Sequence, residues 1–128
     1  EIGLKRAVVV HGSGGLDEAS IEGPNQIRLL EEGKISSIVL DPSDLGISCS
    51  SNSEILGGDL NTNKNILSSV LKGKGTNPQM HVVAINNALV LWAAGLEDDF
   101  TTGFLKSREC LESGLAWDVF LKLKNYLE

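Results

Sequence analysis

The sequence lacks several features, and each absence excludes a class of protein. No apolar run approaches the roughly 18 to 20 residues that a membrane-spanning helix needs, so we expect no membrane partner. The sequence has only 11 Lys and Arg but 17 Asp and Glu, which gives a net charge of −6. This charge argues against a nucleic-acid partner, because proteins that bind nucleic acid carry a basic surface. Cys49 and Cys110 form no CxxC pair, so we exclude a zinc site on cysteine and expect both thiols to be reduced and buried.

The sequence also has no initiator Met and no targeting segment before its first apolar run. We therefore expect it to be cut from a longer protein. The cytoplasm is the expected compartment, and a plastid origin stays open because a transit peptide would precede Glu1. What is present is ordinary for a folded domain, with 128 residues, 41% of them hydrophobic and 22% charged. That length suits one domain, or a piece of one, with a sizeable core.

The first third of the chain is predicted to be rich in strands. Residues 7–10 form a continuous apolar run that ends in a glycine turn, which is typical of a strand buried on both faces in a parallel sheet. Residues 26–31 fit either a strand or a short helix. Residues 35–40 fit a second strand, which stops at Asp41-Pro42.

Helices are predicted for the remainder of the chain. Asp59 fits the N-cap of the first helix, and Gly73 fits its end. Pro78 fits the first turn of the next helix, which runs to residue 94, is apolar nearly all round, and should therefore be buried.

Two further helices are expected at residues 99–113 and 114–127, and the last of them carries an apolar stripe formed by Leu115, Val119, Leu123 and Tyr126. Two aromatic residues are expected in the core rather than in a site, Trp92 and Trp117. The pattern predicts an α/β fold, with a strand-rich part over residues 1–47 and a helical part over residues 48–128.

The densest group of chemically useful residues is the run 11–18, His-Gly-Ser-Gly-Gly-Leu-Asp-Glu, at the carboxyl end of the first predicted strand. Ligands of open α/β sheets bind at that end, and glycines allow backbone N–H groups to approach a ligand closely. Asp17 and Glu18 offer two hard oxygen donors, which suit a magnesium ion that also binds substrate phosphates. The structural alternative is that Asp17 caps a helix that starts here, with Glu18 favourable to the helix dipole.

Other interpretations of this region involve its histidine and its glycines. His11 is either a general acid or base or a hydrogen-bonded structural residue, and with Gly12 it is a candidate for binding substrate. Residues 12–14 and Asp41 fit part of a dinucleotide-binding pattern, but Asp17 stands where a third glycine is needed.

Three polar residues lie in the apolar helix that follows Pro78. Asn86 and Asn87 need hydrogen-bond partners if they are buried, and we expect them to tie this helix to a neighbouring loop. His81, near the helix start, is expected on the surface.

The string VVVHGSGGLDEASIEGPNQI resembles the HGxxGLDE segment of the anthranilate phosphoribosyltransferases. The resemblance continues through LDPSDLGI, through the LGGD start of a helix, and through the spacing from Asn63 to Gly73. It ends with INNALVLWAAG and SRECLESGLAWDVFLKL, so it covers nearly the whole chain in order.

This resemblance implies a specific activity. The family transfers phosphoribose from phosphoribosyl pyrophosphate to the amino nitrogen of anthranilate, in tryptophan biosynthesis, and requires magnesium. Its members are homodimers with a small helical domain and a large α/β domain that holds a mainly parallel sheet. Asp17 and Glu18 would ligate a magnesium ion on the pyrophosphate side.

The resemblance also implies that parts of the enzyme lie outside these 128 residues. The glycine-rich phosphate loop, most of the anthranilate pocket and the helical dimerisation region would lie upstream of Glu1. We therefore expect the chain to be the carboxyl-terminal part of the large domain and to be inactive alone. Two alternatives are a pyrimidine nucleoside phosphorylase of the same fold and a non-catalytic relative that binds nucleic acid. The GLDE string disfavours the first alternative, and the net charge disfavours the second.

Overall fold

Three strands near the start of the chain form one antiparallel sheet, in the order β1 (Arg6–His11), β2 (Asn25–Glu31) and β3 (Lys34–Leu40). The structure is a computed structural model that describes residues 3–127. The predicted α/β class is confirmed, but the parallel arrangement is wrong for these strands. The connections explain the difference, because parallel neighbours need a long crossover. Only Glu32 and Gly33 join β2 to β3, and residues 12–24, all of them described, contain no helix.

One face of the sheet packs against helices and the other is open. On β2, Ile27 and Leu29 are buried while the residue between them is exposed, as the alternation of side chains along a strand requires. On β1, Val8 and Val10 pack on the core, but Val9 is 67% exposed. The expectation that this strand is buried on both faces is therefore wrong within the described residues, whereas the strand interpretation of residues 26–31 is correct.

Two short 3-10 helices and four α-helices follow the sheet, namely η1 (Pro42–Leu45), η2 (Asn52–Ile55), α1 (Leu60–Leu71), α2 (Asn77–Ala93), α3 (Phe100–Glu112) and α4 (Leu115–Leu127). Asp59, Thr76 and Asp99 cap the first three α-helices, each accepting a hydrogen bond from a backbone N–H with its side chain. The predicted cap at Asp59 is confirmed, and Gly73 follows the end of α1 with a φ of +69°. The predicted bounds of the last two helices differ from those observed by no more than one residue.

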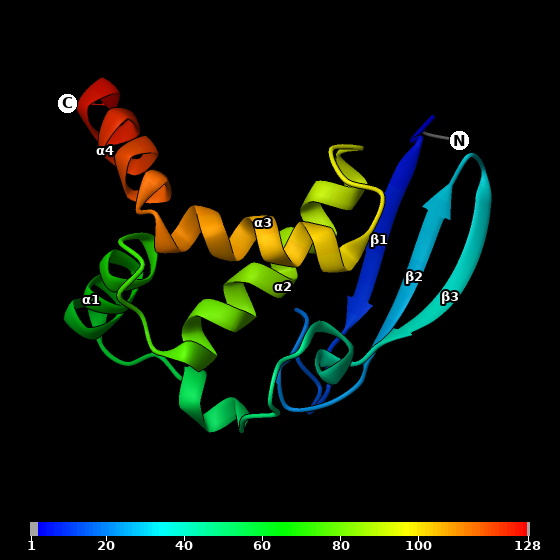
Figure 1. Cartoon of the computed structure of the whole chain (residues 1–128), viewed down its shortest axis with the longest axis horizontal. Coiled ribbons are helices and arrows are strands. Elements are labelled where there is room, and N and C mark those ends of the chain that lie inside the picture. The colour runs from blue at the N-terminus through cyan, green and yellow to red at the C-terminus, as the bar shows by residue number, and fades with distance from the viewer. Residues whose placement is uncertain (1–2, 128) are drawn as a thin grey trace.

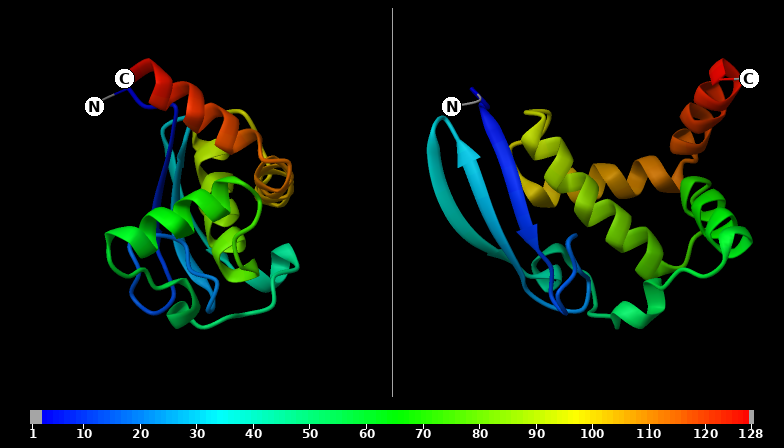
Figure 2. Two further views of the ribbon diagram at one scale, coloured as in Figure 1. Left: turned by 90° about the vertical axis from the view of Figure 1, so that its left-hand side faces the viewer. Right: turned by 180° about the vertical axis from the view of Figure 1, so that it is seen from behind.

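The helix α2 lies between the sheet and the other helices (Figure 1). It contacts β1 on one side and packs along α3 on another. The largest hydrophobic side chains that are fully buried belong to this core: Ile21, Ile27, Ile85 and Phe104. Figure 2 shows α4 pointing away from the rest of the molecule. Among the described residues, no helix combines the length and apolar character that crossing a membrane requires.

The last helix shows where the burial predictions fail. None of the described residues of α4 is buried, and the predicted apolar stripe is open to solvent along its whole length: Leu115, Val119, Leu123 and Tyr126 are 59%, 64%, 56% and 87% exposed. Trp117 is only partly buried, stacked on Phe120 at 5.1 Å between ring centroids, with the Lys72 ammonium 4.2 Å from its ring centroid. The stripe is exposed because α4 touches the body mainly at its junction with α1 and α3.

Three other expectations about burial have different outcomes. Trp92 is in the core, as predicted, with 5% of its surface exposed. Cys49 and Cys110 are both exposed free thiols, so the expectation of buried thiols is wrong. His81 is half-buried rather than on the surface, because its ring packs against Phe104 at 6.0 Å between centroids.

Candidate functional site

The glycine-rich segment forms a tight turn directly after β1. The Gly12 N–H donates to the Leu16 carbonyl at 2.8 Å, and the Gly15 N–H donates to the Gly12 carbonyl at 3.1 Å. Gly14 and Gly15 have φ angles of +78° and +83°, a left-handed conformation that glycine adopts without strain. The shape of the backbone by itself thus calls for glycine at positions 14 and 15.

Asp17 and Glu18 follow this turn, and both are exposed. The helix-cap alternative is wrong, because residues 17–24 are irregular and the chain next enters β2. Neither carboxylate has a hydrogen bond or an ion pair with any other side chain or backbone group in the described part of the chain. Glu18 also lines a hollow of about 370 Å³ between β1 and α2. Both acidic groups are therefore free to bind a cation.

Asn25, the first residue of β2, fixes the middle of this loop through hydrogen bonds to its backbone. Its side chain is fully buried and accepts a hydrogen bond from the Ser20 N–H at 2.7 Å. It donates to the carbonyl oxygens of Ser20 at 3.0 Å and Leu40 at 3.1 Å, and more weakly to that of Gly23. One side chain thereby satisfies several backbone groups that the irregular loop leaves without partners.

Asn52, in η2, holds the same loop through a second set of hydrogen bonds. Its amide nitrogen donates to the Ser13 carbonyl at 3.2 Å and to the Glu22 carboxylate at 2.9 Å, and its amide oxygen accepts from the Ser20 hydroxyl at 2.8 Å. Neither Asn25 nor Asn52 is among the residues predicted from the sequence. Asn25 directly follows Gly23-Pro24, a turn signal that could have drawn attention to it, but Asn52 lies in a serine-rich stretch with no distinguishing local signal.

Asn86 holds the loop from a third direction, in α2. The Ala19 N–H donates to its amide oxygen at 2.8 Å, and its amide nitrogen donates to the Ala19 carbonyl at 2.9 Å. The prediction that Asn86 ties its helix to a loop is confirmed. Asn87 instead donates to the Ser107 hydroxyl at 2.8 Å and so links α2 to α3.

The remaining candidates are His11, Gly12 and Asp41, and of these Gly12 forms part of the turn described above through its N–H and its carbonyl. His11 is exposed at the end of β1, and Gly12 is buried beside it. Asp41 caps η1, accepting from the Ser43 N–H at 2.9 Å and the Ser43 hydroxyl at 2.7 Å, and these bonds lower the pKa of its carboxyl. With Asp41 used as a cap and no crossover helix in residues 12–24, the dinucleotide-binding interpretation is wrong.

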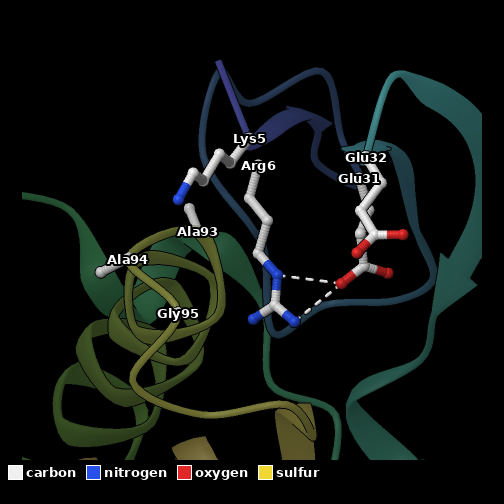
Figure 3. Close-up of a pocket in the computed structure, with 7 residues that line it drawn as sticks. All are labelled: Lys5, Arg6, Glu31, Glu32, Ala93, Ala94 and Gly95. Atoms are coloured by element: carbon white, nitrogen blue, oxygen red, sulfur yellow. Dashed lines mark hydrogen bonds and ion pairs between the residues drawn. The ribbon is translucent and has the colours of Figure 1, made fainter. Parts of the chain in front are cut away.

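A larger hollow of about 430 Å³ lies at the other end of β1, between the strand start and the end of α2 (Figure 3). Arg6 points toward Glu31 there and pairs with both Glu31 and Asp98, each at 2.7 Å. The hydrogen bond to Asp98 is the main reason why the pKa of Arg6 is raised. The guanidinium of Arg6 is thus paired within the protein.

We call residues 12–24, which carry Asp17 and Glu18, the acidic loop. The oxygen donors of this loop determine which metal ion it suits. Within residues 3–127, no three side chains of His, Cys, Asp or Glu gather closely enough to hold a metal ion by themselves. Two carboxylates alone cannot form a complete protein cage. They do fit magnesium, which keeps several waters and is commonly bound by one or two carboxylates together with substrate phosphates.

Residues 1–117 match the family described as "Glycosyl transferase family, a/b domain", and the chain belongs to that family. Several curated relatives are anthranilate phosphoribosyltransferases. This chain is 55% identical over 116 residues to the enzyme of Prochlorococcus marinus (strain MIT 9313), and the alignment covers 91% of this chain and 33% of the relative. It is 48% identical over 126 residues to the enzyme of Prochlorococcus marinus (strain NATL1A), and that alignment covers 98% of this chain and 36% of the relative.

Solved structures of similar enzymes share the fold. The anthranilate phosphoribosyltransferase of Thermus thermophilus superposes with a TM-score of 0.80 at 29% identity, over 91% of this chain and 34% of that chain. The Saccharomyces cerevisiae enzyme in complex with PRPP and Mg superposes with a TM-score of 0.74 at 26% identity, over 87% of this chain and 32% of that chain. The chain therefore spans about a third of the length of the relatives that it matches.

Proposed function

We propose that the chain is the carboxyl-terminal part of the large domain of an anthranilate phosphoribosyltransferase. Such an enzyme transfers phosphoribose from phosphoribosyl pyrophosphate to the amino nitrogen of anthranilate, in tryptophan biosynthesis, and releases pyrophosphate. The observation that carries the proposal is the pair Asp17 and Glu18, exposed and without partners in the described residues, on a loop held by three asparagines. The curated relatives named above support the choice of substrates.

In this proposal Asp17 and Glu18 hold Mg²⁺ on the pyrophosphate side of the substrate. The bound metal would offset the negative charge that develops on the departing pyrophosphate. The loop contributes by holding the backbone that carries the two carboxylates before substrate arrives, so that little ordering of the backbone is required on binding. His11 and Gly12, at the base of the same loop, are the candidates for additional contacts with substrate.

The proposal extends to the whole enzyme. Because the chain spans about a third of its relatives, we expect it to be inactive alone and to need the remaining two thirds for the phosphate loop and the anthranilate pocket. We expect the full-length enzyme to be a homodimer, assembled through a helical region outside these 128 residues, and to work in the cytoplasm.

The test uses a full-length protein that contains this segment, and follows the loss of anthranilate fluorescence with phosphoribosyl pyrophosphate and magnesium. We expect turnover in the parent and a loss of more than about tenfold in Asp17→Asn and in Glu18→Gln, because each removes one charge from the metal site. Asp44→Asn is the matched control, since Asp44 is an exposed acid that belongs to η1 and not to residues 12–24.

Two results would contradict the proposal. Turnover that is unchanged in both acidic variants would remove the metal role of Asp17 and Glu18. A well-folded parent without any turnover would mean that another acceptor is used, and pyrimidine nucleosides and then nucleic acid would be screened next.

A further inference from the structure

We propose that Asn86 is a positioning residue for the acidic pair, acting through the backbone of Ala19. This inference rests on the metal role proposed above for Asp17 and Glu18. Ala19 directly follows Glu18 and is fully buried. The Asn86 side chain accepts from the Ala19 N–H at 2.8 Å and donates to the Ala19 carbonyl at 2.9 Å, although the two residues are 67 positions apart.

A carboxamide suits this position because it is both donor and acceptor. A backbone residue outside regular structure presents one N–H and one carbonyl, and Asn86 satisfies both with one side chain. A third hydrogen bond, from the same amide nitrogen to the Val82 carbonyl at 2.9 Å, holds the side chain against its own helix. The orientation of the Asn86 amide is therefore set by α2, and α2 in turn packs on β1.

The acidic pair consequently lies between two fixed points. On its amino side, the Leu16 carbonyl is bound to the Gly12 N–H at the end of β1. On its carboxyl side, Ala19 is bound to α2 through Asn86. Asp17 and Glu18 are the only residues between these points, so their backbone has little freedom to move. Groups that orient metal ligands in this way affect metal affinity or activity by about 10- to 100-fold when they are mutated.

The experiment compares Asn86→Ala with Asn87→Ala in the full-length protein. Asn87 is a matched control, because it is the next residue on the same helix but bonds to Ser107 of α3 rather than to the loop. We expect the magnesium concentration for half-maximal rate to rise about 10- to 100-fold in Asn86→Ala, with much of the rate restored at saturating magnesium. We expect Asn87→Ala to keep the parent's magnesium requirement.

Two readouts do not depend on activity. Binding of Mn²⁺ in the presence of phosphoribosyl pyrophosphate, followed by electron paramagnetic resonance, should weaken by the same factor in Asn86→Ala. Hydrogen exchange of the Ala19 amide should become faster in that variant alone, because its acceptor is lost. If Asn86→Ala does not fold, Asn86→Ser replaces it, since a hydroxyl keeps a polar group at this position but is too short to make both Ala19 hydrogen bonds, and a weakening of Mn²⁺ binding is then expected.

The outcomes separate this inference from the function on which it rests. If Asp17→Asn and Glu18→Gln weaken Mn²⁺ binding but a folded Asn86 variant binds like the parent, the positioning role is wrong and the proposed metal site survives. If neither acidic variant weakens Mn²⁺ binding, the metal site itself is wrong, and the role of Asn86 is refuted with it.

Discussion

Gly12 packs directly against the backbone of Glu18. A Cβ atom at position 12 would lie 2.0 Å from the carbonyl oxygen of Glu18, and 3.1 Å from the Cβ of Leu16. The oxygen belongs to the main chain, so it cannot turn aside as the end of a flexible side chain can. The first glycine of the HGxxGLDE string is thus needed for the close approach of two stretches of backbone, whether or not a ligand is bound.

The substitution Gly12→Ala should displace the acidic loop. The overlap must be relieved by moving residue 18, and strain of this kind typically costs about 1 to 3 kcal/mol. We expect a lower urea midpoint and a higher magnesium requirement in the full-length enzyme. Gly33→Ala is the control, since Gly33 has a φ of +76° in the β2–β3 turn, far from the loop along the chain. It should lower stability without changing the magnesium requirement. An equal change in that requirement in both variants would contradict the steric role of Gly12.

Asn25 should be among the residues most sensitive to truncation. Asn25→Ala removes a fully buried amide and leaves the backbone N–H and carbonyl of Ser20 without the partner that holds them. Each buried polar group left unsatisfied costs about 1 to 3 kcal/mol, so we expect a total loss of roughly 3 kcal/mol in urea unfolding followed by tryptophan fluorescence. Gln26→Ala, on the exposed face of β2, should change stability by less than about 0.5 kcal/mol. Similar losses in the two variants would show that the buried amide is not the source of the effect.

His81 should make stability depend on pH near neutrality. Burial lowers its pKa in the folded protein, the positive charge of Arg108 lowers it further, and Glu112 opposes the shift. The unfolded chain therefore binds a proton more readily than the folded protein does. The stabilising effect of neutral His81 is complete above its unfolded pKa of about 6.5 and is lost as the pH falls toward its lower folded pKa.

The measurement compares urea midpoints at about pH 7.5 and about pH 5.5, on either side of the ordinary histidine pKa. We expect the midpoint of the parent to fall at the lower pH, and His81→Gln to show a smaller fall. His11→Gln, at an exposed strand end, should keep the parent's behaviour. A fall as large in His81→Gln as in the parent would exclude His81 as its cause.

Arg6 links the start of the sheet to the segment after α2, and we expect this link to raise Tm. Its guanidinium pairs with Glu31 and Asp98, donates to the Trp92 carbonyl at 3.2 Å, and lies 5.0 Å from the centroid of the Trp92 ring. Arg6→Lys keeps the charge but loses the planar fork that reaches several acceptors at once. We therefore expect Arg6→Lys to lower Tm almost as much as Arg6→Ala. The adjacent Lys5→Ala is the control and should leave Tm nearly unchanged. Full retention of Tm by Arg6→Lys would mean that charge alone matters here.

Features with a local physical cause could be predicted from the sequence. Asp59 caps its helix because an acceptor side chain next to free N–H groups is sufficient, and Pro78 lies in the first turn of α2 because that turn needs no N–H donor at its position. Asn86 was correctly expected to bond to a loop, because an amide inside an apolar helix must find a partner. Each of these inferences needed only the neighbouring residues.

Features that depend on distant neighbours could not be predicted in this way. The apolar run of β1 indicates a strand with both faces covered, yet Val9 is exposed within the described residues. The stripe that includes Val119 likewise has the correct spacing but no partner element against it among those residues. In the site, Asn52 was missed because its contacts with Ser13 and Ser20 are more than thirty positions away.

The bond between Ala19 and Asn86 also has a consequence for the order in which the chain folds. The sheet is built from neighbouring strands, and β2 and β3 are joined by a two-residue turn, so it can form from contacts that are close in sequence. The 67 positions between Ala19 and Asn86, at a ribosomal rate of about 5 to 20 residues per second, take roughly 3 to 13 s to synthesise. The acidic loop therefore acquires its final shape seconds after the strands beside it have been made.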